Sequence, residues 1–199
     1  MKQRVLIIFG LCFALINANA QKIGVKAGLN LSDAKYEIFG TGISTSSLVG
    51  FHAGLICETA LSESVYLNAA ALYSMKGATI SLLGAEADFP ISYVEIPVNI
   101  AYKYDLGGAK LFAQVGPYAG IGISAKVKGA GGEETIDFGS AIDELKRFDF
   151  GANFGAGVEI MKVQLGVSYG LGLVNISNDP DESIKNGGLS FSVVLYFNE

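Results

Sequence analysis

The feature that most constrains this chain is a strict alternation of apolar residues with polar residues or glycines. In residues 23–31 the odd positions hold Ile, Val, Ala, Leu and Leu, whereas the even positions hold Gly, Lys, Gly and Asn. Successive side chains point to opposite faces of a β-strand, so this period predicts a strand with one apolar face. The pattern recurs and predicts eight strands, at about 22–31, 49–58, 65–74, 94–103, 111–123, 149–160, 163–173 and 189–197.

The polar face of these strands is too poor in charge to be the surface of a soluble protein. Only 17% of the residues are charged, and 26 are glycines, whereas soluble domains carry about 25% charged residues. A soluble barrel of the lipocalin type would turn this glycine-rich face to water. In a membrane barrel the aliphatic face meets lipid and the glycines fit the narrow interior. The fold class predicted is therefore all-β, an eight-stranded antiparallel up-and-down transmembrane β-barrel, with the last strand paired to the first because hydrocarbon tolerates no open edge.

The connections between these strands alternate in length. Long segments are expected at 32–46, 77–91, 125–148 and 174–187, and short ones at 59–63, 105–109 and 161–162. Short turns of such barrels are periplasmic and long loops extracellular, so both ends of the mature chain are expected in the periplasm. Within the third long segment, Ile142, Leu145 and Phe148 recur at helical spacing and predict a short helix over 140–148.

The first twenty residues read as a secretory signal peptide. Lys2 and Arg4 precede an apolar run from 5 to 16, and residues 18–20 are Ala, Asn and Ala. We therefore expect domains of 1–20 (signal peptide) and 21–199 (barrel), cleavage after Ala20 and residence in the outer membrane of a Gram-negative cell. The alternative is an uncleaved membrane anchor. Cleavage removes Cys12, and Cys57 is then expected to be an inert small hydrophobe on the lipid face.

Ionisable residues on the polar faces are expected to meet inside the barrel. Charges in a narrow lumen must pair or stay hydrated, and eight-stranded barrels are largely filled by their own side chains. We therefore predict a salt-bridged plug rather than an open pore, with Tyr66, Tyr118 and Tyr196 packed against the glycines. The lumen network is predicted to contain Lys26, His52, Glu95, Lys103, Asp149 and Glu159.

No pattern predicts a catalytic, cofactor or metal site. His52 is the single histidine, and as a catalytic base it would need partners for which only Ser74 and Glu58 are conceivable. The third and fourth long segments are acidic, with Glu133, Glu134, Asp137 and Asp179 among their carboxylates. Divalent cations or lipopolysaccharide are possible contacts for them, but an ordinary solvated loop is the favoured interpretation. The net charge of −5 excludes nucleic acid as an expected partner.

Several segments together resemble the PorT-like outer-membrane β-barrel family, also called porin-family proteins. Those segments are 24–30 (GVKAGLN), 72–78 (LYSMKGA), 93–98 (YVEIPV), 115–120 (VGPYAG), 148–151 (FDFG) and 169–171 (YGL). The chain departs from the family at Ala70, where a glutamate is usual, and in Asn198 and Glu199, which follow the terminal aromatic Phe197. The resemblance implies the fold and the location, and it links some members to protein secretion, but it implies no single activity.

These observations favour a non-enzymatic envelope protein that acts through its external loops as a structural or interaction module, with secretion as an associated process. Two alternatives remain: passive diffusion of small solutes, and a barrel enzyme that uses His52. Expected partners are membrane lipid, lipopolysaccharide, other envelope proteins and the barrel-assembly machinery, which would read the last strand ending at Phe197.

Overall fold

A computed structural model describes residues 21–43, 45–82, 85–129 and 131–198. The expected signal peptide, 1–20, lies outside these residues. Within them no helix has the length and hydropathy needed to cross a membrane. The strands are β1 (Gln21–Ile38), β2 (Thr41–Ile43), β3 (Thr45–Ala60), β4 (Val65–Leu82), β5 (Ala85–Asp105), β6 (Lys110–Gly129), β7 (Gly132–Ile136), β8 (Phe148–Ile160), β9 (Val163–Gly172) and β10 (Glu182–Tyr196).

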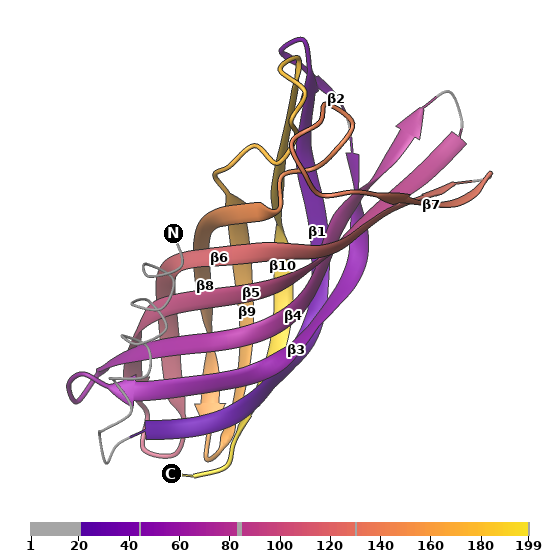
Figure 1. Cartoon of the computed structure of the whole chain (residues 1–199). Coiled ribbons are helices and arrows are strands. Elements are labelled where there is room, and N and C mark those ends of the chain that lie inside the picture. The colour runs from indigo at the N-terminus through magenta and orange to yellow at the C-terminus, as the bar shows by residue number, and fades with distance from the viewer. Residues whose placement is uncertain (1–20, 44, 83–84, 130, 199) are drawn as a thin grey trace.

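Eight of these strands close into a ring, which confirms the predicted fold class. The sheet runs β10-β9-β8-β6-β5-β4-β3-β1, and β10 pairs antiparallel with β1 to complete the barrel. That closing register is long, from Gly24 opposite Tyr196 to Ile38 opposite Glu182. The short strands β2 and β7 lie outside the ring and pair antiparallel with the ends of β1 and β6 (Figure 1). Closure leaves no open edge in the ring, as a strand-built membrane span requires.

The two faces of the barrel differ as the alternation predicts. Leu29 and Leu55 on the outer face are 57% and 59% exposed, whereas Tyr118 and Tyr196 on the inner face are each 1% exposed. The outer face carries aliphatic and aromatic side chains on every strand of the ring. The exterior of the barrel is therefore an apolar band of the kind that hydrocarbon covers.

Glycines give the inner aromatic rings their space. Gly151 lies directly opposite Tyr118, and Gly157 directly opposite Phe112, on the neighbouring strands β8 and β6. A Cβ at Gly157 would lie 2.6 Å from the Phe112 ring. The predicted packing of Tyr118 on a bare glycine is thus present in the structure.

The prediction of four long loops is wrong in extent, because strands occupy most of the first two segments and part of the other two. β1 continues to Ile38, and β4 pairs with β5 up to Leu82 opposite Ala85. β6 continues to Gly129 and then pairs with β7. Backbone groups that leave the membrane region still gain from pairing, and these segments keep the period of two although their outer face is more polar. By contrast, β8 begins only at Phe148 and β9 ends at Gly172, so the wall is lower on that side (Figure 1).

The expected short helix over 140–148 is also absent. This segment is irregular, with isolated bridges from Leu145 to Phe138 and to Ser177. Glu144 N donates to Ala141 O at 3.1 Å, which makes a single turn. The helical spacing of Ile142, Leu145 and Phe148 does not indicate a helix here, because Leu145 is buried while Ile142 and Phe148 are each 68% exposed.

The two ends of the barrel have different structures. One end, which we call the turn end, carries the connections at 61–64, 106–109 and 161–162 and both Gln21 and the C-terminal residues (Figure 1). After β10 ends, Phe197 N still donates to Ile23 O at 2.8 Å. The opposite end, the loop end, carries β2, β7, the β4–β5 hairpin and the segments 137–147 and 173–181. This matches the predicted placement of the long connections on one side.

Candidate functional site

A cluster of ion pairs fills the lumen near the turn end. Lys103 Nζ lies 2.5 Å from Glu58 Oε1 and also contacts Glu159, which in turn accepts a hydrogen bond from Lys22 at 3.0 Å. Tyr196 Oη donates to the second oxygen of Glu58 at 3.1 Å. The side chains of Lys103, Glu58 and Glu159 are at most 3% exposed. Two ammonium groups therefore balance two carboxylates across β1, β3, β5 and β8.

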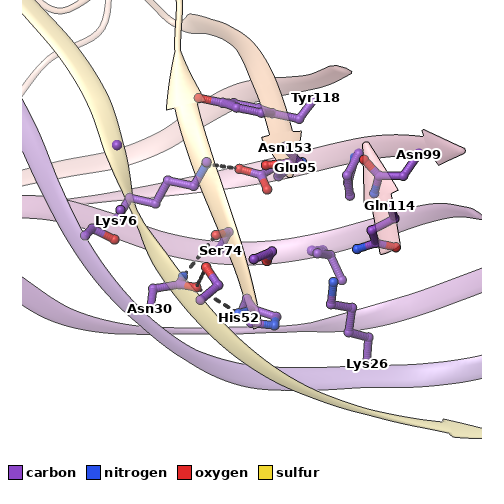
Figure 2. Close-up of a pocket in the computed structure, with 18 residues that line it drawn as sticks. Lys26, Asn30, His52, Ser74, Lys76, Glu95, Asn99, Gln114, Tyr118 and Asn153 are labelled. Atoms are coloured by element: carbon purple, nitrogen blue, oxygen red, sulfur yellow. Dashed lines mark hydrogen bonds and ion pairs between the residues drawn. The ribbon is translucent and has the colours of Figure 1, made fainter. Parts of the chain in front are cut away.

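Above this cluster, the single histidine is held by an asparagine. His52 Nδ1 lies 2.8 Å from Asn30 Oδ1, and Asn30 Nδ2 donates to Ser74 Oγ at 3.3 Å and to Met75 O at 2.9 Å (Figure 2). Ser190 Oγ also donates to Asn30 Oδ1 at 2.8 Å. Glu58, the other conceivable catalytic partner of His52, belongs to the turn-end cluster instead. His52 is thus buried in a hydrogen-bond network and has no carboxylate orienting it.

A second ion pair lies close to this network and joins β4 to β5. Lys76 contacts Glu95, and its Nζ lies 4.1 Å from the centre of the Tyr118 ring (Figure 2). Lys26 also points into the lumen, yet within the described residues it forms no hydrogen bond or ion pair, and the charge of Glu95 acts on it at longer range. A polar cavity of about 40 Å³ borders Lys26, His52 and Glu95. That volume admits about three water molecules. Water in this cavity can therefore hydrate the Lys26 ammonium.

A third level consists of a carboxylate held by neutral donors. Asn186 Nδ2 donates to Asp149 Oδ2 at 2.9 Å and to Tyr93 Oη at 3.0 Å. Tyr118 Oη donates to the same Asp149 oxygen at 3.3 Å. Asp149 is 2% exposed and Tyr93 is 1% exposed. This layer crosses the lumen from β5 and β6 to β8 and β10.

An apolar layer closes the lumen at the loop end. Ile176 and Ala125 are 0% exposed, and they pack with Ile91, Tyr93 and Leu145. Lys146 N donates to Ile176 O at 2.8 Å, so the segments 137–147 and 173–181 are bonded to each other over the barrel mouth. The lumen is consequently filled by side chains at both ends.

The six residues predicted for the lumen network all face the interior, but they divide among different levels. Lys103 and Glu159 share the turn-end cluster, while His52, Glu95 and Asp149 lie higher and bond to other partners. Sequence reasoning missed Lys22, Glu58 and Lys76 as partners. Glu58 and Lys22 stand on the inner face of expected strands, and Lys76 stands at the correct parity just beyond the expected end of its strand. Among the described residues at these levels, the ammonium groups of Lys22, Lys26, Lys76 and Lys103 balance the carboxylates of Glu58, Glu95, Asp149 and Glu159.

A much larger cavity, of about 600 Å³, lies at the loop end. Inward positions of β1, β4, β5 and β10 form its walls, and the segments 142–145 and 176–182 cover it where β8 and β9 are short. Its apolar lining includes Ala78, Ile80, Phe89, Ile136 and Ile184. Four carboxylates also border it, those of Asp143, Glu144, Asp179 and Glu182. They are not arranged as ligands, since no group of three or more histidine, cysteine or acidic side chains in the described part of the chain is placed to hold a metal ion.

The chain is similar to the following known proteins. The sequence model described as outer membrane protein beta-barrel domain matches residues 17–178. No curated protein matches the sequence. Among solved structures, Ail, the attachment invasion locus protein of Yersinia pestis, is 14% identical, with 89% of this chain and 98% of Ail covered and a TM-score of 0.43. Neisserial surface protein A is 16% identical, with 88% and 97% covered and a TM-score of 0.49. The N-terminal barrel domain of Pseudomonas aeruginosa OprF is 10% identical, with 85% and 96% covered and a TM-score of 0.37.

The sequence match spans about four fifths of the chain and includes β1 to β9. The closed ring and the apolar exterior are the features that such a domain requires in a membrane. The chain belongs to the outer membrane protein beta-barrel domain family, and its place is the outer membrane.

Proposed function

We propose that this protein is a non-conducting, non-enzymatic outer-membrane barrel that acts as an interaction module through its extracellular end. The observation that carries the proposal is the contrast between the two halves of the barrel. The lumen is filled, with a cavity of only about 40 Å³, whereas the loop end is built out by paired strands and encloses about 600 Å³. Short turns are periplasmic in such barrels, so the loop end is the extracellular end.

The filled lumen argues against the alternative of passive diffusion. A solute that enters from outside would first have to displace Ile176 and Tyr93, which are 0% and 1% exposed. It would then have to break the pairs of Lys103 with Glu58 and Glu159. Separating a buried ion pair is strongly unfavourable, so a thermally open channel is not expected.

The surroundings of His52 argue against an enzyme. A catalytic histidine needs an orienting acceptor on one nitrogen and a nucleophile or substrate on the other. Asn30 Oδ1 is an acceptor for Nδ1 of His52, but Nε2 is buried and no described nucleophile bonds to it. The apolar layer of Ile176 and Leu145 separates this histidine from the extracellular side.

Planar-bilayer recording tests the proposal directly. Purified barrel should give no conductance steps, while a variant with Lys103, Glu58 and Glu159 all changed to alanine serves as the opened comparison. Stable steps from the unmodified protein would overturn the non-conducting part. For the interaction part, crosslinking in native membranes is compared between the full chain and a variant whose β4–β5 hairpin is shortened by removing 79–88. Identical crosslinked products from both proteins would argue against an extracellular interaction through this hairpin.

We further propose export with a signal peptide cleaved after Ala20, membership of the PorT-like branch, and insertion by the assembly machinery through β10. Support comes from the leader composition, from the six ordered motifs, and from Phe197, which is 58% exposed at the end of β10. Tyr93 and Glu95 of the motif at 93–98 face the lumen, where each has a polar partner. The intact mass of the membrane form should correspond to a chain that starts at Gln21. A mass that retains residues 1–20 would exclude cleavage and favour the anchor.

A further inference from the structure

The inner face of the barrel changes character along its axis. At the level of the membrane it carries the ion pairs, asparagines and glycines described above. Beyond the layer of Tyr93, Asn186 and Asp149, the same inward parity carries apolar side chains instead. On β1, β4, β5 and β10 they are Ala34, Ala78, Ile80, Phe89, Ile91 and Ile184, and Ile136 of β7 and Ile176 of the covering segment lie beside them. The apolar interior thus begins where the lumen network ends.

This apolar interior is not collapsed. The cavity of about 600 Å³ lies within the range of small-molecule pockets, roughly 300–1,000 Å³. Its floor is sealed from the lumen because Asn186 is bonded to both Tyr93 and Asp149. Its cover consists of the segments 142–145 and 176–182, which are bonded to each other. Ile176 N also donates to Ile184 O of β10 at 2.9 Å. The cavity is therefore a closed-bottomed compartment at the extracellular end.

The charge around the cavity is strongly one-sided. Asp143, Glu144, Asp179 and Glu182 border it, and Lys126 is the single cation among its described lining residues. Lys126 Nζ is paired with Glu133 at 2.5 Å, and hydrogen bonds from Lys126 and Lys128 lower the pKa of Glu133 below its ordinary value. Glu133 thus remains ionised at neutral pH and keeps Lys126 neutralised. The ammonium of Lys146 is bonded to the carbonyls of Asn175 and Ser177 and contacts none of the four carboxylates.

One of the four carboxylates is held rigidly by hydrogen-bond donors. Tyr36 Oη donates to Glu182 Oε1 at 2.9 Å, and Ser177 Oγ donates to Oε2 at 3.3 Å. Both donors are neutral, so they fix the position of the carboxylate without cancelling its charge. No described cation lies within ion-pair distance of Glu182, Asp179, Asp143 or Glu144. An uncompensated, fixed negative charge beside an apolar compartment suits a cation with an apolar body.

We propose that this extracellular cavity binds small apolar molecules that carry a cationic group, such as alkyl or aryl amines. The inference deepens the proposed function, because it assigns a ligand class to the extracellular end that function invokes. The apolar body occupies the space between Phe89, Ile80 and Ile184, and the ammonium lies toward Glu182 and Asp179. Anionic amphiphiles, including lipids with phosphate headgroups, are disfavoured because the same carboxylates repel them.

The sequence contains no tryptophan, so a single introduced tryptophan is the only indole fluorophore in the protein. Phe89→Trp places one reporter in the cavity, and the protein is reconstituted in nanodiscs of zwitterionic lipid. The probes are a dansyl-labelled alkylamine and the dansyl-labelled alkanoate of equal length, read by energy transfer from the tryptophan. Tyr104→Trp, on the turn end, reports the transfer that arises from probe dissolved in the lipid. If Phe89→Trp does not fold, Ile80→Trp is the second reporter, since Ile80 also lines the cavity.

The proposal predicts saturable transfer for the amine in the cavity reporter and only linear background in the Tyr104→Trp protein. The amine should bind about tenfold more tightly than the alkanoate. Asp179→Asn with Glu182→Gln should weaken amine binding about two- to tenfold, while Glu63→Gln in a periplasmic turn should not change it. Ala78→Phe, which fills the cavity, should weaken both probes.

Two results would overturn the inference in different ways. Equal transfer in the cavity and turn-end reporters would show that neither probe enters the cavity. Saturable binding with no preference for the amine would show that the carboxylates do not select the ligand. Either result would leave a silent planar-bilayer recording unaffected, so the failure of this inference is distinguishable from the failure of the proposed function.

Discussion

Lys103 Nζ lies 2.5 Å from Glu58 Oε1 inside the barrel, although 45 residues separate them in the sequence. The same ammonium contacts Glu159 on a third strand. One lysine therefore connects β3, β5 and β8 across the lumen, and its side chain is 2% exposed. This connection is the structural basis of the first prediction.

Lys103→Met should destabilise the barrel by about 3–5 kcal/mol, because it leaves two buried carboxylates without their shared cation. Urea unfolding from lipid vesicles measures this change. Lys110→Gln is the matched control: Lys110 pairs with Asp105 at 3.8 Å at an exposed position, and its loss should cost less than about 1 kcal/mol. Equal effects of the two substitutions would contradict a structural role for the cluster.

Glu95→Gln should destabilise the protein less than Lys103→Met, by about 1–3 kcal/mol. Glu95 pairs with Lys76, but both border the polar cavity of about 40 Å³, where the remaining lysine keeps access to water. The thermal midpoint in detergent, followed by the gel shift between folded and unfolded barrel, gives the comparison. No change in that midpoint would exclude a stabilising role for this pair.

The docking of the segment 137–147 at the loop end depends on a glycine. A Cβ at Gly122 would lie 2.5 Å from Cζ of Phe138, and Gly122 N donates to Arg147 O at 2.7 Å. Gly122→Val should displace the Phe138 ring and loosen 137–147 while the barrel stays folded. Limited proteolysis should then cut this segment faster, by several-fold. Adding Phe138→Ala to the Gly122→Val protein removes the clash, so cleavage should slow toward the rate of the unmodified protein. Equally fast cleavage in the single and the double variant would contradict a role for the Phe138 ring.

The period of two was sufficient to predict the strands, the closure and the inward side of each strand. The reason is that parity persists through a strand, so Lys26, Glu95 and Glu159 are placed on one face by their numbers alone. Pairing across the lumen was not predictable in the same way. It depends on the stagger between non-adjacent strands, which brings Glu58 of β3 to Lys103 of β5. The spacing of residues in the sequence contains no measure of that stagger.

The cavity at the loop end could have been predicted from the sequence. Ala34, Tyr36, Ala78, Ile80 and Ile184 continue the inward parity of their strands into segments expected to be loops, yet they are apolar or aromatic. A solvated loop gives no reason for such a pattern, whereas a barrel wall that continues beyond the membrane does. The cover could not have been predicted, because it rests on contacts between 137–147 and 173–181 that follow no local period.

The final prediction concerns the phenol that holds Glu182. Burial, followed by the hydrogen bond and charge of Glu182 and the charge of Asp179, raises the pKa of Tyr36 to about 12. The folded protein holds this proton more tightly than the unfolded chain, in which a tyrosine ionises near pH 10. The resulting stabilisation is therefore complete below about pH 10 and is lost as the pH rises through about 12. In ¹³C NMR of labelled tyrosine, Glu182→Gln should move the Tyr36 midpoint toward lower pH, because the acceptor charge is gone. Glu37→Gln, on the outer face of the same strand, should leave it in place, and a Tyr36 midpoint insensitive to Glu182 would show that this carboxylate is not fixed by the phenol.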